Sequence, residues 1–196
     1  RMPKIIGLTG GIGSGKSKAA GHFSELGVSC YITDDRAKDL MNSNKNLQQA
    51  IVNEFGAESY INGNLNRSFI ASFVFKDTNL LAKLNTIVHP AVADDFNSWL
   101  IEKNSVYVIK EAAILFENDV AKLCDQVILL TAPEEIRIQR VIDRDKCTKE
   151  DVLERISKQW SDAKKKPLAD YIIENIEWIE TSKQIRTLHQ KLIESR

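Results

Sequence analysis

Short apolar runs alternate with stretches of helical spacing along much of the chain. Several apolar runs have the length of buried strands: residues 4–9, 28–32, 106–109, 126–131 and 171–173. Stretches with apolar residues on one helical face lie between or after these runs: residues 17–26, 133–141, 148–160 and 181–193. Thr148 and Asp151 have the spacing of a capping box at the start of the third stretch. This alternation predicts a parallel sheet with helices on both faces.

The middle of the chain, from about residue 37 to residue 103, has a different pattern and is expected to be mostly helical. Gly56, the turn-like Asn62-Gly63-Asn64 and His89-Pro90 interrupt it. Because proline lacks the N–H that a helix interior requires, Pro90 is expected at the first position of a helix.

A glycine-rich loop follows the first predicted strand, and Gly10-Gly11-Ile12-Gly13-Ser14-Gly15-Lys16-Ser17 matches the pattern GxxxxGK[ST]. Glycines let the backbone curl so that successive N–H groups point at phosphate oxygens, and the following helix adds its dipole. Lys16 would reach the β- and γ-phosphates, and the Ser17 hydroxyl would hold Mg²⁺. The backbone N–H of Lys18 can join them. The loop follows a strand and opens a helix, so the chain is expected to bind nucleotide phosphates.

Composition excludes several functional classes. The 196 residues carry 27 basic and 27 acidic side chains, and this balance argues against a nucleic-acid-binding or polybasic membrane surface. No apolar run approaches the roughly 18 to 20 residues that span a bilayer, so no transmembrane helix is expected. The three cysteines are Cys30, Cys124 and Cys147, and no two form a CxxC pair. A reducing cytoplasmic setting is the simplest interpretation.

Motifs of other nucleotide-binding classes are missing. A GTPase would carry NKxD, whereas Asn44-Lys45 is followed by Asn46-Leu47, and neither DxxG nor LSGGQ occurs. An arginine-rich segment late in the chain favours a small-molecule kinase with a mobile lid. Arg140 and Arg144 share a helical face and could clamp the transferred phosphoryl group, or they could form a solvated face beside acids such as Asp143. The loop alone fits a nucleoside or nucleotide monophosphate kinase equally well, and a nucleotide-switch regulator and a degenerate binding module remain as other classes.

Segments that follow one another along nearly the whole chain resemble the dephospho-coenzyme A kinase family, whose members catalyse the last step of coenzyme A synthesis. The segments that carry the resemblance are Ile6 to Ser17, Thr33-Asp34-Asp35, Asn64 to Arg67, Leu84 to Pro90, Glu111 to Glu117, Arg140 with Arg144-Asp145, Arg155 with Gln159, and Ala169 to Asn175. The chain departs from the family pattern at Thr33, where Asp is common, at Lys18, where Thr is frequent, and at Ala113, where Pro is frequent.

The resemblance implies a three-layer α/β P-loop kinase fold, a parallel sheet flanked by helices, in a single domain over residues 2–196. It implies a nucleotide-binding core at 4–35 and 104–140, a helical acceptor region at 37–103 and a lid at 140–166. The implied reaction is the ATP- and Mg²⁺-dependent phosphorylation of the ribose 3′-hydroxyl of dephospho-coenzyme A. The oligomeric state is left open.

The resemblance also implies roles for single residues. Asp35 would orient the acceptor hydroxyl and take its proton, although Asp34 or Asp35 could instead cap the following helix. Glu111 could anchor a Mg²⁺ water or be a surface carboxylate. The acceptor would also be contacted by Thr9, Arg67, His89 and Glu117, although Glu117 is equally compatible with a structural contact. Asn175 would contact the adenine of ATP. The run Lys164-Lys165-Lys166 has the character of a solvated face that could also help to close the lid over an anionic nucleotide.

Overall fold

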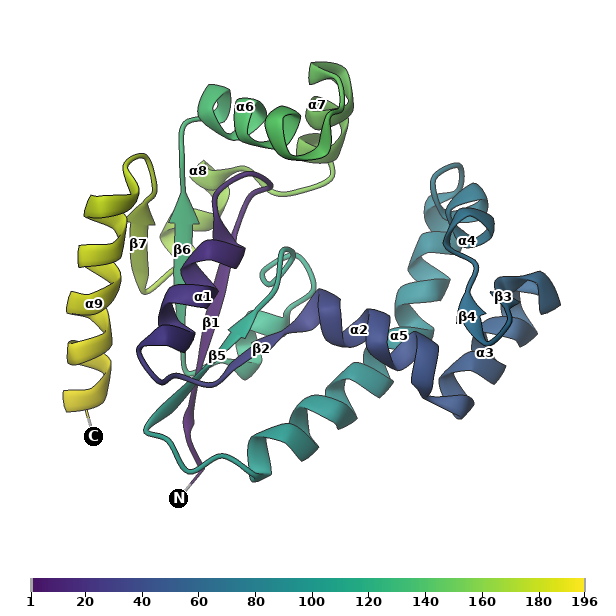
Figure 1. Cartoon of the computed structure of the whole chain (residues 1–196), viewed down its shortest axis with the longest axis horizontal. Helices are drawn as coiled ribbons and strands as arrows, with labels where there is room; N and C mark the ends of the chain where they lie inside the picture. The colour runs from purple at the N-terminus through teal and green to yellow at the C-terminus, as the bar shows by residue number, and fades with distance from the viewer. Residues whose placement is uncertain (1, 196) are drawn as a thin grey trace. The chain divides into compact units, whose positions relative to one another are not determined.

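The computed structural model describes residues 2–195 and divides the chain into two compact units (Figure 1). The larger unit contains the residues up to Ile32 and those from Lys103 onward, and the smaller one is Thr33–Glu102. Within residues 2–195 no helix is both long and apolar enough to cross a membrane.

The larger unit is built on a five-stranded sheet in which every pair of neighbours is parallel, in the order β2-β5-β1-β6-β7. Its strands are β1 (Lys4–Gly10), β2 (Cys30–Ile32), β5 (Tyr107–Glu111), β6 (Gln126–Thr131) and β7 (Tyr171–Glu174). Its helices are α1 (Lys16–Glu25), α6 (Glu134–Asp145), α7 (Lys149–Ser157), α8 (Asp162–Lys165) and α9 (Trp178–Glu194), with short 3₁₀ turns η2 (Val120–Leu123) and η3 (Lys166–Leu168). The α/β fold with a parallel sheet is therefore confirmed.

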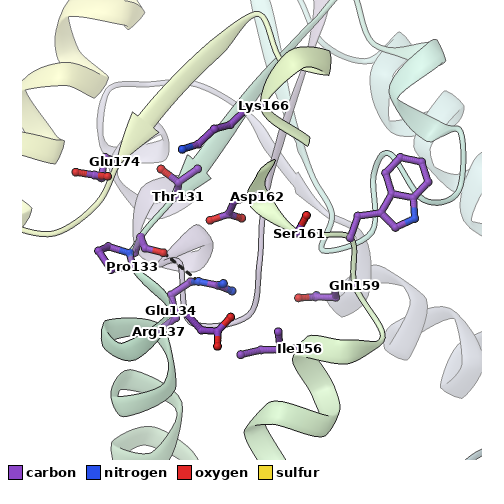
Figure 2. A pocket seen from close by; sticks show the side chains of 12 residues that line it. Thr131, Pro133, Glu134, Arg137, Ile156, Gln159, Ser161, Asp162, Lys166 and Glu174 are labelled. Atoms are coloured by element: carbon purple, nitrogen blue, oxygen red, sulfur yellow. Dashed lines mark hydrogen bonds between the residues drawn. The ribbon is translucent and has the colours of Figure 1, made fainter. Parts of the chain in front are cut away.

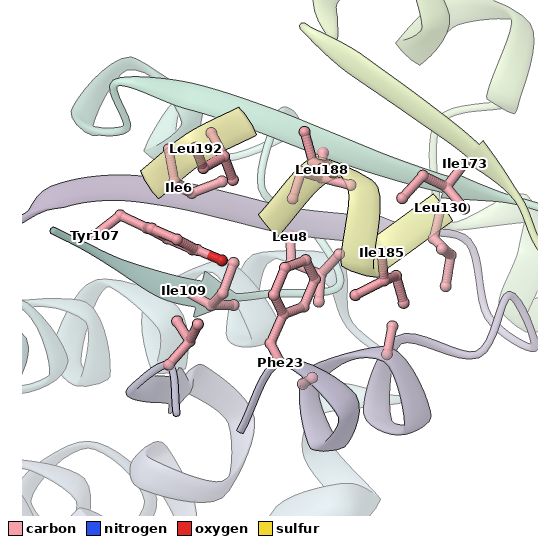
Figure 3. Close-up of a cluster of buried hydrophobic side chains, with 14 residues drawn as sticks. Ile6, Leu8, Phe23, Tyr107, Ile109, Leu130, Ile173, Ile185, Leu188 and Leu192 are labelled. Carbon is pink, nitrogen blue, oxygen red and sulfur yellow. The ribbon is translucent and has the colours of Figure 1, made fainter. Parts of the chain in front are cut away.

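The core of this unit lies between the sheet and the pair α1 and α9. Ile6 and Leu8 on β1 are fully buried there, together with Phe23 from α1 and Ile185 from α9 (Figure 3). Because side chains alternate along a strand, Gly7 faces the opposite side of the sheet, where an added Cβ would lie 2.7 Å from the Leu115 side chain. The segment after β5 covers that second face.

Helices α6 and α7 form a hairpin with its own apolar centre. We call residues 134–159, which are this hairpin and the two residues after it, the lid. Ile138 and Val141 from α6 pack there against Val152 from α7. The predicted capping box at Thr148 and Asp151 is present. The expectation that this helix continues to residue 160 is wrong, because α7 ends at Ser157 and the next residues bond to other parts of the unit.

The smaller unit is mostly helical, as predicted. Its elements are α2 (Thr33–Ser43), α3 (Lys45–Phe55), η1 (Ala57–Ser59), β3 (Tyr60–Ile61), β4 (Asn64–Leu65), α4 (Arg67–Val74) and α5 (Thr78–Ile101). Strands β3 and β4 pair antiparallel around the predicted turn, where Asn62 and Gly63 both have positive φ. This combination is typical of a tight hairpin turn.

The prediction for Pro90 is wrong, because this residue lies inside α5 and not at the start of a helix. The apolar stripe runs through the proline without interruption, since Val88, Val92, Phe96 and Leu100 are all buried at a spacing of four. Burial of that stripe offsets the missing backbone hydrogen bond, and α5 changes direction along its length (Figure 1).

Candidate active site

The glycine-rich loop joins the carboxyl end of β1 to the N-terminus of α1, where residues 10–15 curl back on themselves. Gly13 and Gly15 have φ values of 79° and 96°, in the left-handed region that favours glycine. A Cβ on Gly13 would overlap the backbone of Arg137, and one on Gly15 would overlap the Asn175 amide. The loop therefore has the backbone shape and the helix end of a phosphate-binding loop.

Lys16 and Ser17 open α1, as the motif requires. The Lys16 ammonium donates to the carbonyl oxygens of Gly10 and Gly11, at 2.9 and 3.4 Å, so its charge lies over the first residues of the loop. Lys18 directs its side chain away, with Nζ 4.5 Å from the centre of the Trp178 ring. Lys18 thus offers the loop its backbone N–H and not its charge.

Asn175 and Arg140 hold the loop from the side of β6 and β7. The Asn175 amide is buried, donates to the Ser14 carbonyl at 2.9 Å, and accepts from the Thr181 hydroxyl at 2.9 Å. Arg140 donates to the carbonyl oxygens of Gly13, at 3.3 Å, and Asn175, at 2.7 Å. Both side chains therefore shape the phosphate loop, and the Asn175 amide is already engaged by protein groups.

The side chains of Arg137 and Gln159 both bond to the backbone of one loop residue, Ile12. The Ile12 N–H donates to Gln159 Oε1 at 2.9 Å, and the Ile12 carbonyl accepts from Arg137 Nη1 at 3.4 Å. Arg137 is buried and also donates to the Ala132 carbonyl at 3.1 Å. The two side chains border a cavity of about 490 Å³ that is strongly charged (Figure 2). Its other charged lining residues are Glu134, Asp162, Lys166 and Glu174.

Arg144 lies at the last turn of α6 and is exposed. Its guanidinium donates to Asp145 through Nε at 2.6 Å and Nη2 at 3.0 Å, and Arg155 of α7 donates to the same carboxylate at 2.8 Å. These bonds from Arg144 and Arg155 hold the pKa of Asp145 far below its ordinary range. The partner of Arg144 is therefore Asp145 and not Asp143, which accepts from Gln139.

The residues that could hold Mg²⁺ are Ser17 and Glu111. Ser17 follows the loop lysine, and Glu111 is buried at the carboxyl end of β5, beside Leu8 of β1 in the sheet register. Residues 2–195 contain no cluster of three or more His, Cys, Asp or Glu side chains that could cage a metal. This donor set fits Mg²⁺, which binds through one or two protein oxygens together with substrate phosphates and water.

Thr9 and Glu117 are both engaged by protein groups. The buried Thr9 hydroxyl donates to the Ala113 carbonyl at 3.4 Å. Glu117 Oε2 accepts the Trp160 N–H at 3.3 Å and lies 3.6 Å from the ammonium of Lys165. The side chain of Lys165 is completely buried, so the expectation of a solvated lysine run is wrong at this position. A buried ammonium requires a counter-charge, which explains why it faces Glu117.

Asp35, Arg67 and His89 belong to the smaller unit. Asp34 and Asp35 are exposed in the first turn of α2, where their charge favours the helix N-terminus. Arg67 opens α4, and His89 is exposed on α5. The next residue after Asp35 forms a two-point ion pair, because Arg36 donates to both oxygens of Asp95 at 2.9 and 2.6 Å. This pair fixes α2 against α5 and so fixes the helix that carries Asp35.

Sequence reasoning missed the contacts of Arg137 and Gln159 with the phosphate loop. Arg137 had a detectable signal, because it precedes Arg140 and Arg144 by three and seven residues and so shares their helical face. Gln159 lay in the segment that resembled the family, but no local pattern indicates that it bonds to a residue 147 positions earlier.

Known proteins of one family are similar to this chain over most of its length. Residues 4–180 match the family model of dephospho-CoA kinase. Dephospho-CoA kinase of Bacteroides fragilis is 33% identical over 171 residues, which are 87% of this chain and 83% of that protein. A crystal structure from Thermus thermophilus is 30% identical with a TM-score of 0.86 and covers 100% of both chains. Dephospho-CoA kinase from Campylobacter jejuni has the same fold, at 20% identity and a TM-score of 0.66, again over 100% of both chains. The chain therefore belongs to the dephospho-CoA kinase family.

Proposed function

We propose that this kinase transfers the γ-phosphoryl group of ATP to the ribose 3′-hydroxyl of dephospho-CoA by the following division of roles. The observation that carries the proposal is the phosphate loop, whose left-handed Gly13 and Gly15 open α1 and whose backbone is braced by Arg140 and Asn175. The backbone N–H groups of this loop, through Lys18, hold the phosphates, and Lys16 supplies a positive charge for the β- and γ-phosphates.

Ser17 and Glu111 would hold Mg²⁺ beside the phosphates. A Mg²⁺ ion held by these two residues would supply positive charge that offsets the negative charge developing during the transfer. Glu111 is rigidly placed for this role, since it is buried at the end of a central strand.

The lid arginines stabilise the phosphoryl group during transfer. Arg140 already lies against the loop, whereas Arg144 is exposed and oriented by Asp145. Fixed guanidinium donors at the place where charge develops lower the barrier without reorganisation at the moment of reaction.

Asp35 orients the 3′-hydroxyl and accepts its proton while the new oxygen–phosphorus bond forms and the bond to ADP breaks. Orientation contributes more than basicity, because phosphoryl transfer has a loose transition state. Arg67, His89 and Thr9 are the further side chains proposed to contact the acceptor. The free cysteines Cys30, Cys124 and Cys147 fit a reducing cytoplasm.

The test is an ADP-release assay with Mg·ATP in which dephospho-CoA is offered beside AMP, CMP, dTMP and adenosine, with product mass checked for one added phosphate. Selective turnover of dephospho-CoA is expected. Asp35→Asn should lower kcat by about a hundredfold or more, within the range for general-base residues, whereas the neighbouring Asp34→Asn serves as the matched control. Turnover of a monophosphate in place of dephospho-CoA would contradict the proposed acceptor, and a larger loss in Asp34→Asn would move the base to Asp34.

A further inference from the structure

Ile12 is the residue of the phosphate loop that both ends of the lid reach, while Arg140, farther along α6, donates to the neighbouring Gly13 carbonyl. Arg137 lies in the first turn of α6, and Gln159 lies just beyond the end of α7, so the two ends of the lid reach the same residue. Gln159 accepts the Ile12 N–H, and Arg137 donates to the Ile12 carbonyl. The Ile12 side chain packs against the apolar centre of the lid, beside residues such as Val141. Both backbone polar groups and the side chain of Ile12 are therefore engaged by the lid.

The segment that carries Gln159 is in turn fixed by Glu117. The residue after Gln159 is Trp160, whose N–H donates to Glu117 Oε2 at 3.3 Å. The fully buried Lys165 then places its ammonium 3.6 Å from the same carboxylate oxygen. The carboxylate of Glu117 is only 11% exposed. Two contacts therefore tie this segment to one buried carboxylate, at Trp160 and at Lys165.

We propose that Gln159 and Glu117 are positioning residues: Gln159 fixes the peptide of Ile12, and Glu117, paired with Lys165, fixes the segment that carries Gln159. The inference rests on the proposed function, since it concerns the loop that binds the phosphates of ATP. It gives Glu117 a role inside the protein in place of the substrate contact that family resemblance implied. A loop held in shape by the lid binds ATP phosphates without first having to order itself.

The first test compares Gln159→Met with Gln139→Met. Both variants replace a glutamine by an apolar side chain of similar length, but Gln139 is exposed on α6, where its side-chain amide donates to Asp143. The dissociation constant of Mg·ATP is measured by calorimetry on folded protein, and the Michaelis constants of both substrates follow from initial rates. Loss of one hydrogen bond predicts an ATP dissociation constant raised about three- to tenfold in Gln159→Met. Gln139→Met should match the wild type, and the Michaelis constant of dephospho-CoA should be unchanged in both.

The second test separates a positioning role of Glu117 from a substrate contact. Glu117→Gln keeps an acceptor for the Trp160 N–H but leaves the buried ammonium unpaired, so it should weaken ATP binding and can reduce the yield of folded protein. The double variant Glu117→Gln with Lys165→Met removes both charges and keeps the acceptor. It should fold and bind ATP within about twofold of the wild type, because the pair has been replaced by neutral groups of similar volume.

Several outcomes would overturn the inference. One is an equal ATP dissociation constant in Gln159→Met and Gln139→Met. Another is a raised Michaelis constant for dephospho-CoA in the Glu117→Gln, Lys165→Met variant with ATP binding unchanged, which would make Glu117 a substrate contact. Failure of the proposed function is seen separately, because it would leave the wild type unable to phosphorylate dephospho-CoA whatever the variants do to ATP binding.

Discussion

Replacing Gly13 by alanine tests the interpretation of the phosphate loop most directly. Gly13 has a φ of 79°, and the left-handed backbone costs a residue with a Cβ about 1–2 kcal/mol. The added methyl would also come under 3.0 Å from the backbone of Arg137 in α6, where no flexible side-chain end can yield. Overpacking of this kind costs about 1–3 kcal/mol. The two effects together predict a loss of roughly 2–5 kcal/mol in the free energy of unfolding.

Gly21→Ala is the matched control. Gly21 lies inside α1, and a Cβ there would meet nothing within 4 Å. Because glycine is a poor helix former, the same substitution should stabilise the protein by about 0.5–1 kcal/mol at this position. The two alanine variants are therefore expected to shift stability in opposite directions.

Calorimetric melting and ATP titration measure the two consequences of Gly13→Ala. A chain of this size shifts its melting temperature by about 2–4 °C per kcal/mol, so a drop of roughly 4–20 °C is expected. ATP binding should weaken in Gly13→Ala and stay unchanged in Gly21→Ala. A Gly13→Ala protein that melts and binds ATP as the wild type does would refute the strained, tightly packed loop on which the site depends.

Three further predictions concern other parts of the chain. Burial lowers the pKa of His189, whose Nδ1 lies 2.7 Å from the Tyr107 hydroxyl. In the unfolded chain this histidine has its ordinary pKa of about 6.5, so below that pH the unfolded state binds more protons than the folded state and the melting temperature should fall. His189→Gln should flatten this pH dependence. Pro90→Ala should restore a backbone donor inside α5 and raise the stability of the smaller unit, measured by denaturant titration, by up to about 3 kcal/mol. A loss of stability would show instead that packing requires the bend in α5. Asp145→Asn should lower kcat roughly tenfold with little change in the ATP dissociation constant, because Arg144 of α6 and Arg155 of α7 both lose their charged acceptor. An unchanged kcat would show that Arg144 has no part in the reaction.

Prediction from the sequence succeeded where the relevant interactions are local. Strand periodicity located β6 at residues 126–131 in agreement with the structure, and the Thr148–Asp151 spacing located the start of α7. The same reasoning failed at Pro90, where the local rule for proline was outweighed by a buried stripe that continues on both sides of it.

The sequence by itself determined the nucleotide-binding loop, because glycines, a lysine and a serine at fixed spacing dictate one backbone shape. The family came from the resemblance carried by the segments that follow the loop along the chain. Only the tertiary structure decided what surrounds the loop. Gln159 meets Ile12 across 147 positions, and Lys165 is buried against Glu117 within a run that looked solvated. No local pattern encodes such contacts, since a buried charged side chain needs polar or oppositely charged partners, and folding brings these from elsewhere in the chain.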